Sequence, residues 1–441
     1  MNYIYSVVAV MLLSGCAQKV EVTQEKKIDT AQQKEIVQEL VEIPQKPSFY
    51  TSGVQEKKLG DIELFIGKYF RAWNIDKISI TQEQAKWAYV YDNNKSYGYT
   101  LQPITKSFFQ TIDENSNYEA FSTLNRYAVT LKLLNVRALP TDKPVFLDPS
   151  KAGEGYPFDY LQNTSIAPNK PIFVSHYSKD KKWVFIESSF GFGWVKAKDI
   201  VFIDQKYTLL WQKAQQIFLL KDNETIYDQN GNYLFDSRVG MMLPLIDEDE
   251  KSYTVLSVAK SKENEPLFLH SKISKEIAHK GILDFNSDNV AVIMNELQKG
   301  KYGWGGIYGQ RDCSSTLRDL YTPFGLWLPR NSSVQSSIGD VKKLDLLSNE
   351  EKELFIKEKG IPFETLVYKK GHIALYVGTY NDQAIIFQNV WGVKTKKDEN
   401  EGRFLIAKPV FSTLEVGKNL KEFDPDASML SKLQSINHLL E

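Results

Sequence analysis

A glycine-rich segment that ends in a cysteine constrains this chain of 441 residues more than any other feature. Residues 301–321 read KYGWGGIYGQRDCSSTLRDLY, with four glycines before Asp312 and Cys313. Glycine allows tight turns and close backbone approach, and Asp312 is a favourable N-cap for a helix that begins at Cys313. The positive end of that helix favours a thiolate and lowers its pKa, and its free amides can hold an oxyanion. The segment therefore predicts a cysteine nucleophile.

A cysteine nucleophile needs a base and a polar group that orients the base. His372 follows a predicted turn at 369–371 and begins the strand-like run 372–379. Gln388 and Asn389 end the next strand-like run, so antiparallel pairing would bring Gln388 beside His372, with Asn389 as the rival for this place. The order cysteine, histidine, polar residue is that of papain-type enzymes.

The only other cysteine, Cys16, lies in a very different setting. Residues 3–13 form an apolar run with the length of a signal-peptide core, which is too short to span a bilayer. The run ends in Leu-Ser-Gly-Cys16, which resembles the bacterial lipoprotein cleavage box, although no Lys or Arg precedes it. The resemblance implies an acylated Cys16 and a lipid-anchored protein of the cell envelope. Ala17 implies the outer membrane or its periplasmic face if the cell is Gram-negative. Cys313 would then be a lone thiol in an exported chain.

Composition and patterning divide the rest of the chain. Residues 17–48 are rich in Gln, Glu and Lys and contain neither glycine nor an aromatic residue before position 49, which predicts a disordered tether; a solvated helix over 29–42 is the alternative. The segment 61–73 places apolar residues on one helical face, and 81–91 is a second predicted helix. Short apolar runs between turn residues then predict two small β units. An α+β unit follows, with helices over 287–297, after Cys313 and over 349–360, and strands over 363–368, 372–379, 384–389 and 402–409.

Several motifs together resemble the NlpC family of papain-like cell-wall peptidases, which includes the p-sixty proteins. They are Tyr302-x-Trp-Gly-Gly, Asp312-Cys313-Ser314, Leu328-Pro-Arg330-Asn-Ser-x-x-Gln335 and Gly371-His372-Ile. Residues 134–140 and Gly193-Trp194-Val195 resemble the opening and closing signatures of bacterial SH3-like domains. The resemblance implies an α+β papain-like domain behind two all-β SH3-like barrels and a mostly helical N-terminal segment. The expected boundaries are 1–16 signal peptide, 17–48 tether, 49–130 stabilising domain, 131–204 and 205–272 SH3-like domains, 273–420 peptidase domain and 421–441 tail.

The family resemblance also implies an activity and a set of site residues. The expected reaction is hydrolysis of the bond between the γ-carboxyl of D-glutamate and a diamino acid in peptidoglycan stem peptides, with a preference for a free N-terminal L-alanine. Cys313 is then the nucleophile, His372 the base and Gln388 the third residue, in a place that is more often histidine in the family. Tyr302, Asp312 and Ser314 match positions that bind the substrate amine, and Glu187 is the candidate carboxylate from an SH3-like wall. Arg330 is expected either to pair with a substrate carboxylate or to stabilise its own loop.

Two other hypotheses about the function are compatible with most of these features. One is a papain-like amidase or acyltransferase of the envelope, which would keep the triad and differ in the pocket. The other is a non-enzymatic cell-wall-binding lipoprotein, against which the intact Cys313 and His372 count. The net charge of −1 gives no argument for a nucleic-acid partner. The remaining histidines show no tight metal-ligand spacing, so we expect no metal and no cofactor.

Overall fold

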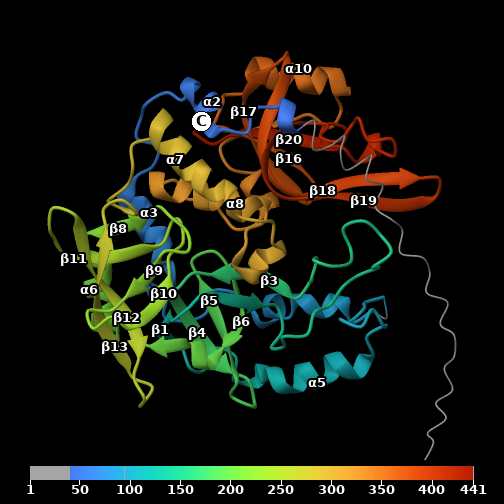
Figure 1. Cartoon of the computed structure of the whole chain (residues 1–441). Helices are drawn as coiled ribbons and strands as arrows, with labels where there is room; N and C mark the ends of the chain where they lie inside the picture. The colour runs from blue at the N-terminus through green and yellow to red at the C-terminus, as the bar shows by residue number, and fades with distance from the viewer. Residues whose placement is uncertain (1–39, 94, 441) are drawn as a thin grey trace, which may run out of the picture.

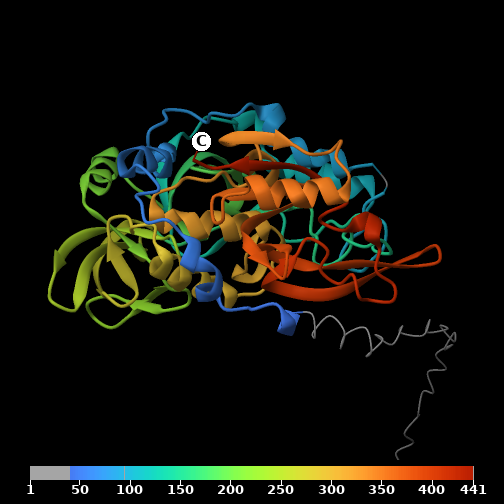
Figure 2. The same cartoon turned by 90° about the horizontal axis from the view of Figure 1, so that it is seen from above.

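The computed structural model describes residues 40–93 and 95–440, which form an N-terminal helical region, two small β domains and a C-terminal α+β domain. The α+β domain (yellow-orange to red in Figure 1) lies across the two β domains (green to yellow-green), and the N-terminal helices (blue to cyan) run along both. The view from above shows the same packing of all parts into one body (Figure 2). None of the helices in the described part of the chain has the length and apolar character needed to cross a membrane.

The N-terminal region consists of short helical elements that contact all three other domains. Those over residues 47–53 contact the helix 287–298 of the α+β domain, the helix 62–69 packs against the second β domain through Phe65, and those after residue 70 pack mainly onto the first β domain. Asp61 caps α3 by accepting hydrogen bonds from the amides of Glu63 and Leu64. The single helix expected over 61–73 breaks after Tyr69, because Phe70 and Trp73 both turn inward and are fully buried. The second expected helix, over 81–91, likewise divides into two short elements. The helical elements here are α2 Pro47–Tyr50, η1 Thr51–Gly53, α3 Ile62–Tyr69, η2 Arg71–Trp73, α4 Gln82–Ala85, η3 Trp87–Tyr91, α5 Lys106–Ser116 and η4 Tyr118–Ala120.

The end of the expected tether is packed against the α+β domain, which corrects the predicted boundary at residue 48. Gln45 exchanges two hydrogen bonds with the backbone of Phe411, at 2.8 and 3.1 Å, and its carbonyl accepts a third from Gln298 at 3.0 Å. Ile43 is buried in the same core. These partners lie about 250 to 370 residues away in the sequence, so no local pattern signals them. Residues 17–39 of the predicted tether and Cys16 lie outside the described residues.

The first β domain is a seven-stranded antiparallel sheet in the order β3-β2-β6-β5-β4-β1-β7. Its first strand begins at residue 126, ahead of the expected boundary at 131. The two predicted signatures meet in space, because Arg137 on β2 pairs with Trp194 on β6. Gly193 is required there, since a Cβ would lie 2.5 Å from the carbonyl of Arg137. The strands are β1 Arg126–Thr130, β2 Leu134–Arg137, β3 Gln162–Ile166, β4 Pro171–Tyr177, β5 Trp183–Ser188, β6 Phe192–Lys196 and β7 Ile200–Phe202, with η5 Ala197–Asp199 before β7.

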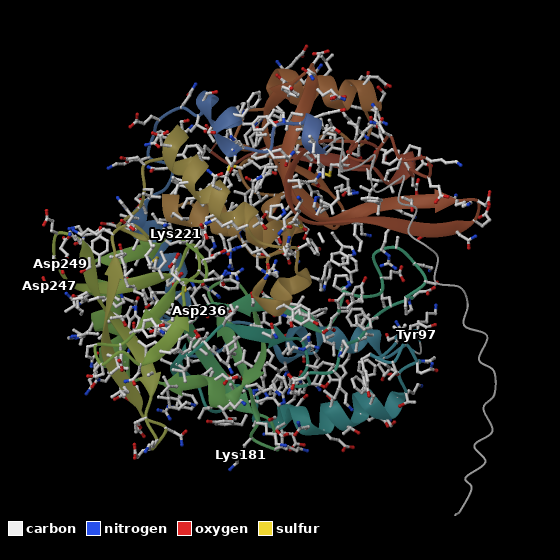
Figure 3. All side chains as sticks on the ribbon, viewed as in Figure 1. Tyr97, Lys181, Lys221, Asp236, Asp247 and Asp249 are labelled. Atoms are coloured by element: carbon white, nitrogen blue, oxygen red, sulfur yellow. The ribbon has the colours of Figure 1, made fainter. Side chains whose placement is uncertain are left out.

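The second β domain follows a linking helix, α6 Gln205–Lys213. Its five-stranded sheet has the order β13-β12-β11-β8-β14, and its last strand lies beyond the expected end at 272 because Ala278 pairs with Leu219. The acidic end of β11 and the turn after it, marked by Asp247 and Asp249, lie at the edge of the molecule (Figure 3). The strands are β8 Gln216–Leu219, β9 Thr225–Tyr227, β10 Tyr233–Asp236, β11 Met242–Glu248, β12 Ser252–Lys260, β13 Pro266–Ser274 and β14 Ala278–Lys280; β9 and β10 form a separate hairpin.

The α+β domain places a six-stranded sheet between two layers of helix. Side chains alternate along a strand, and on β17 the buried Ile373 and Leu375 face α7 and α8 while Ala374 and Tyr376 face α10. The sheet order is β15-β20-β16-β17-β18-β19. The elements are α7 Ser287–Gln298, η6 Trp304–Gly309, α8 Cys313–Tyr321, η7 Thr322–Phe324, α9 Ser332–Gln335, β15 Asp340–Lys343, α10 Asn349–Lys359, β16 Thr365–Lys369, β17 His372–Tyr380, β18 Gln383–Lys397, β19 Asn400–Thr413, η8 Pro425–Ala427 and β20 Leu433–His438.

Within the segment 421–441, which is expected to be a tail, residues Leu433–His438 form a buried strand in the core of this domain. Strand β20 lies inside the sheet, between β15 and β16. Nδ1 of His438 and the hydroxyl of Thr365 form a hydrogen bond of 2.9 Å. The side-chain amide of Asn437 donates to the carbonyls of Gln335 and Ile338. The hydrogen-bond partners of β20 lie about 70 to 100 residues earlier in the sequence, so its local sequence does not reveal them.

Candidate active site

Cys313 is the first residue of α8, and Asp312 caps that helix as the sequence predicts. The Asp312 carboxylate accepts from the Ser315 amide at 3.0 Å, and the Ser315 hydroxyl accepts from the Asp312 amide at 2.9 Å. This reciprocal pair is a capping box, and it fixes the backbone on both sides of Cys313. The amides of Cys313 and Ser314 belong to the first helical turn, which has no intrahelical acceptor. The site therefore offers a fixed thiol beside free backbone donors.

The glycines before Cys313 allow the loop to approach the first β domain more closely than other residues could. Gly305 and Gly306 have φ values of +57° and +79°, which disfavour residues with a Cβ. A Cβ at Gly305 would lie 2.3 Å from the carbonyl of Gln162, and one at Gly306 would lie 2.2 Å from the Ser165 hydroxyl. Gln162 also donates to the Gly305 carbonyl at 3.0 Å. The loop is therefore held against β3 by contacts that only glycine permits.

His372 begins β17 directly after Gly371, whose φ of +83° makes the turn from β16. Its Nε2 lies 2.7 Å from Oε1 of Gln388 on β18. The Ser412 hydroxyl donates to the Thr413 carbonyl, so it accepts from Nε2 of Gln388, at 2.7 Å. This chain of bonds turns the amide oxygen of Gln388 toward the ring, which makes Nε2 of His372 the protonated nitrogen. Nδ1 then carries the lone pair that a base requires.

Asn389 lies on the opposite face of β18 from Gln388. Its amide donates to the carbonyl of Arg311 at 2.7 Å and to the hydroxyl of Thr316 at 3.0 Å. Asn389 therefore ties β18 to α8 and does not contact the ring of His372. The sequence leaves open whether Gln388 or Asn389 lies beside His372. Because side chains alternate between the two faces of β18, Gln388 occupies this position and Asn389 does not.

Burial sets the charge state of both reactive groups. The Cys313 side chain is buried, and burial together with the Asp312 carboxylate raises the pKa of its thiol to about 12, against the opposing effects of the Ile373 amide, Arg330 and the Ser314 amide. Burial and the Lys369 cation lower the pKa of His372 to about 4, against the opposing hydrogen bond to Gln388. The expectation of a depressed thiol pKa is therefore wrong for this state, because desolvation outweighs the helix terminus. A neutral thiol and a neutral imidazole face the cleft.

Arg330 pairs with the carboxylate of Asp312, a partner that the sequence does not indicate. Its Nη2 lies 2.5 Å from one oxygen of Asp312 and its Nη1 lies 3.1 Å from the other. Nη1 also donates to the Ser314 hydroxyl at 2.9 Å, and Nε donates to Thr164 of the first β domain at 2.7 Å. Of the two expected roles, a partner for a substrate carboxylate or a loop-stabilising group, the geometry matches the second.

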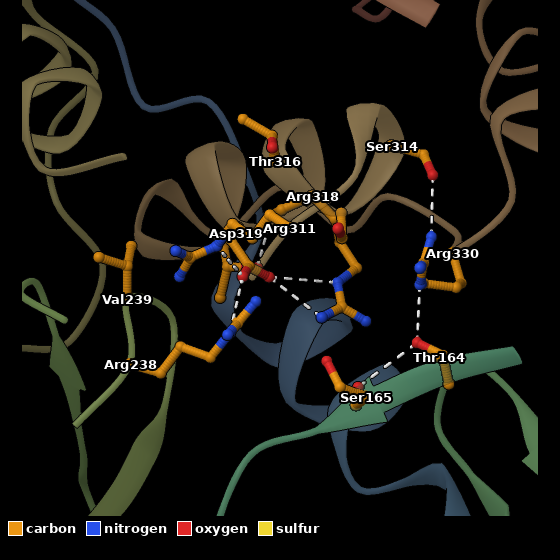
Figure 4. Close-up of polar contacts among 12 residues, drawn as sticks. Thr164, Ser165, Arg238, Val239, Arg311, Ser314, Thr316, Arg318, Asp319 and Arg330 are labelled. Carbon is orange, nitrogen blue, oxygen red and sulfur yellow. Dashed lines mark hydrogen bonds and ion pairs between the residues drawn. The ribbon is translucent and has the colours of Figure 1, made fainter. Parts of the chain in front are cut away.

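A buried network of charges holds α8 against the second β domain (Figure 4). Asp319, on the same helix as Cys313, accepts from Arg311 at 2.6 Å, from Arg318 at 3.0 Å and from Arg238 of the second β domain at 3.3 Å. Arg311 also forms an ion pair with Asp222 of that domain. These guanidinium groups hold the pKa of Asp319 well below its usual range despite its burial. Both β domains therefore position the helix that carries the thiol.

The reactive residues lie in a cleft between the α+β domain and the first β domain. On the Cys313 side is a cavity of about 630 Å³, lined by Tyr302, Asp312 and Ser314 and by Asn163 and Thr164 from the β domain. The side of His372 and Gln388 opens into a second cavity, of about 290 Å³. Tyr302, Trp304 and Gly371 line both cavities, so the two cavities adjoin each other. The hydroxyl of Tyr302 has no hydrogen-bond partner within the described residues, which leaves it free for a ligand.

Glu187 is not part of this cleft, which corrects its expected role. Its carboxylate is buried and faces the N-terminal region, where it accepts from Arg71 at 2.7 Å and from the Ser79 amide at 2.8 Å. The β-domain wall of the cleft instead presents neutral groups, among them Tyr160, Gln162 and Asn163. No sequence signal separates these wall residues from others in the domain, because only the folded register brings them to the cleft. Within the described residues, no cluster of acidic, His or Cys side chains forms a metal site.

Comparison with known proteins assigns all four regions. Residues 5–121 match the N-terminal stabilising domain of NlpC/P60 proteins, residues 144–196 match an SH3 domain of the SH3b1 type, residues 204–250 match one of the SH3b2 type, and residues 299–402 match the NlpC/P60 family. An NlpC/P60 endopeptidase from Photobacterium damselae subsp. piscicida has a similar structure, with a TM-score of 0.78 and 25% identity over 90% of this chain and 98% of that one. An NlpC/P60 family protein from Bacillus cereus ATCC 10987 shows 17% identity over 63% of this chain and 82% of that one, with a TM-score of 0.43. No curated protein shows significant sequence similarity to the chain.

These matches define the class of protein to which the chain belongs by its combination of domains. The chain combines a stabilising domain, two SH3-like domains and a cysteine peptidase domain. Its peptidase domain belongs to the NlpC/P60 family, whose peptidases act on the bacterial cell wall.

Proposed function

We propose that this protein is a cysteine endopeptidase that hydrolyses peptidoglycan stem peptides at the bond between the γ-carboxyl of D-glutamate and a diamino acid. The observation that carries the proposal is the arrangement of Cys313 at the capped start of α8, with His372 and Gln388 2.7 Å apart on the adjoining strands. The NlpC/P60 match over residues 299–402 supports the substrate class.

The proposed reaction follows from the protonation states of the site. Nδ1 of His372 takes the proton of the thiol as Sγ of Cys313 attacks the γ-carbonyl carbon, and the first-turn amides of α8 receive the oxyanion. The C–N bond breaks, the leaving amine takes the proton from His372, and a thioester to Cys313 remains. Water then gives a proton to His372 and attacks the thioester, which releases the D-glutamyl acid and returns the proton to the thiol.

The acyl side of the substrate is proposed to occupy the larger cavity. The free Tyr302 hydroxyl and Asp312 are the groups that would receive an N-terminal amine there. Asp312 provides the sole carboxylate among the described residues that line this cavity. It already forms an ion pair with Arg330. We therefore expect the preference for a free L-alanine amine to be less than about tenfold, since a neutralised carboxylate attracts an amine weakly. Comparison of a free with an N-acetylated stem peptide measures this preference.

The test of the proposed activity uses L-Ala–γ-D-Glu–diaminopimelate with the wild-type protein, Cys313→Ala and Cys313→Ser. We expect the wild type to release L-Ala–D-Glu and free diaminopimelate, detected by mass spectrometry, and both variants to be inactive with unchanged melting temperatures. Wild-type protein that cleaves no D-glutamyl peptide would refute the endopeptidase assignment and favour a wall-binding protein. Transfer of the acyl group to an added amine without hydrolysis would instead favour an acyltransferase.

We further propose that Cys16 carries a lipid anchor at the cell envelope. The described part of the chain begins beside the peptidase domain, where Gln45 donates to the carbonyl of Phe411 at 2.8 Å. Labelling with radioactive palmitate should mark the wild type and leave Cys16→Ala unlabelled. Equal labelling of the two proteins would disprove the anchor.

A further inference from the structure

We propose that the cavity on the His372 side is a subsite for the leaving amino acid and that Arg403 and Lys369 in it bind a carboxylate of that residue. This inference rests on the proposed endopeptidase function and adds to it the charge of the leaving group.

The position of the cavity assigns it to the leaving group. His372 and Gln388 line this cavity, whereas Cys313 and Asp312 line the larger one on the other side. A general acid must lie within hydrogen-bond reach of the nitrogen that it protonates. The leaving amine therefore lies next to His372, and the rest of the leaving residue extends into the adjoining space of about 290 Å³.

The charge of the cavity is unbalanced in favour of cations. Lys369, Lys394 and Arg403 line it, and Asp424 is the one carboxylate among its described lining residues. Lys394 is already engaged, because its Nζ lies 2.6 Å from Glu401 and 3.6 Å from Asp424. The two other cations have no carboxylate partner within the described part of the chain.

The two free cations retain donors that a ligand can use. Lys369 donates to the carbonyl of Ala427 at 2.9 Å and has two further N–H groups. Arg403, on β19, forms no ion pair or side-chain hydrogen bond within residues 40–93 and 95–440. The fork of an arginine matches a carboxylate in a bidentate pair, and such a charge-assisted contact is strong where water is partly excluded.

A third donor and an aromatic wall complete the site. The indole N–H of Trp391 is buried and has no hydrogen-bond partner in the described structure. Its ring packs with those of Phe158 and Tyr302, with centroids 6.4 and 6.0 Å apart. Because a buried donor without an acceptor is unfavourable, a bound acceptor group would satisfy it. An apolar wall with several converging donors and no free acid fits an aliphatic amino acid that carries carboxylates, such as a diamino acid with a second acid group.

The test varies only the leaving residue of the substrate. L-Ala–γ-D-Glu is joined to diaminopimelate, to lysine, or to lysine amide, so that carboxylates are removed in steps while the scissile bond stays the same. We expect wild-type kcat/KM to fall by about tenfold or more from the first peptide to the last, as the loss of a charge-assisted contact predicts. Arg403→Gln and Lys369→Met should reduce the ratio of kcat/KM for the diaminopimelate peptide to kcat/KM for the lysine amide peptide toward one.

The ratio between substrates is the decisive readout, because Lys369 also acts on the pKa of His372 and its loss alters the rate for every peptide. Lys394→Met is the matched control, since this lysine lines the same cavity but is already paired, and it should leave the ratio unchanged. Equal cleavage of the three peptides by the wild type, or an undiminished ratio in Arg403→Gln, would overturn the inference while leaving the endopeptidase function intact. Cleavage of none of the peptides would refute the function itself.

Discussion

The charge on the third residue beside His372 should control the lower pH limit of activity. Gln388 can orient His372 through its amide oxygen at 2.7 Å but supplies no negative charge. Gln388→Glu replaces this contact with a carboxylate next to a half-buried ring. A hydrogen bond between charged groups contributes about 1.5–3 kcal/mol, and one pKa unit corresponds to about 1.36 kcal/mol. The pKa of His372 should therefore rise by about one to two units, from about 4 to between about 5 and 6.

The sign of the effect on activity follows from the proposed role of His372 as a base. Only the neutral imidazole can take the thiol proton, so activity is lost as the pH falls through the pKa of His372. The acid limb of kcat/KM against pH should lie near pH 4 in the wild type and move upward by about one to two units in Gln388→Glu. The assay follows release of diaminopimelate from the tripeptide between pH 3.5 and 8.

Ser412→Ala is the matched control for this experiment. It removes the group that holds the Gln388 amide without adding a charge. Loss of that neutral hydrogen bond, about 0.5–1.5 kcal/mol, should lower the rate by about two- to tenfold and leave the acid limb in place. An acid limb that does not move in Gln388→Glu, or that moves equally in Ser412→Ala, would refute the assignment of this limb to His372.

Three further outcomes test other parts of the site. Alkylation of Cys313 by iodoacetamide should rise steadily from pH 5 to pH 9, because the pKa of its thiol is raised to about 12; a rate that is constant below pH 7 would indicate a thiolate–imidazolium pair instead. Gly306→Ala should lower the free energy of unfolding by about 1–3 kcal/mol more than Gly153→Ala, because both have positive φ but only the Cβ at 306 meets the Ser165 hydroxyl; equal losses in denaturant titrations would contradict the close-approach argument. Asp319→Asn should lower stability by about 3–5 kcal/mol, against less than about 1 kcal/mol for the exposed Asp142→Asn. Since the pKa of Asp319 is lowered by folding, its contribution is fully present above about pH 4 and declines progressively as the pH falls toward the lowered pKa of the folded state. The difference between Asp319→Asn and wild type should therefore shrink when melting is followed below pH 4.

The features that the sequence predicts correctly depend on local patterns. The Asp312 cap, the start of α10 after Ser348 and the strand that begins at His372 each follow from a few adjacent residues. The alternation of side chains along β18 then separates Gln388 from Asn389 as soon as the strand is known to pair with β17. Within such patterns, the physical chemistry of three to ten residues is enough to locate the reactive groups.

The features that the sequence does not predict depend on partners that are distant along the chain. Glu187 has the charge expected of an amine-binding residue, but Arg71 and Ser79 of the N-terminal region use that charge. The strand β20 and the packed residue Gln45 are likewise defined by contacts with segments that lie far away in the sequence. The pKa of Cys313 belongs to the same group, because it is set by desolvation, which arises only when the whole cleft has closed around the thiol.

The SH3-like domains are therefore structural parts of the active site. Gln162 and Ser165 of the first domain fix the glycine loop ahead of Cys313, and Thr164 holds Arg330, which in turn holds Asp312. Arg238 of the second domain supports the helix from its other side through Asp319. Because the thiol lies at the start of this helix, any movement of either domain displaces the helix cap and the backbone donors together. Desolvation is the largest cause of the neutral state of Cys313 and His372, and the neighbouring charges of Asp312 and Lys369 act in the same direction.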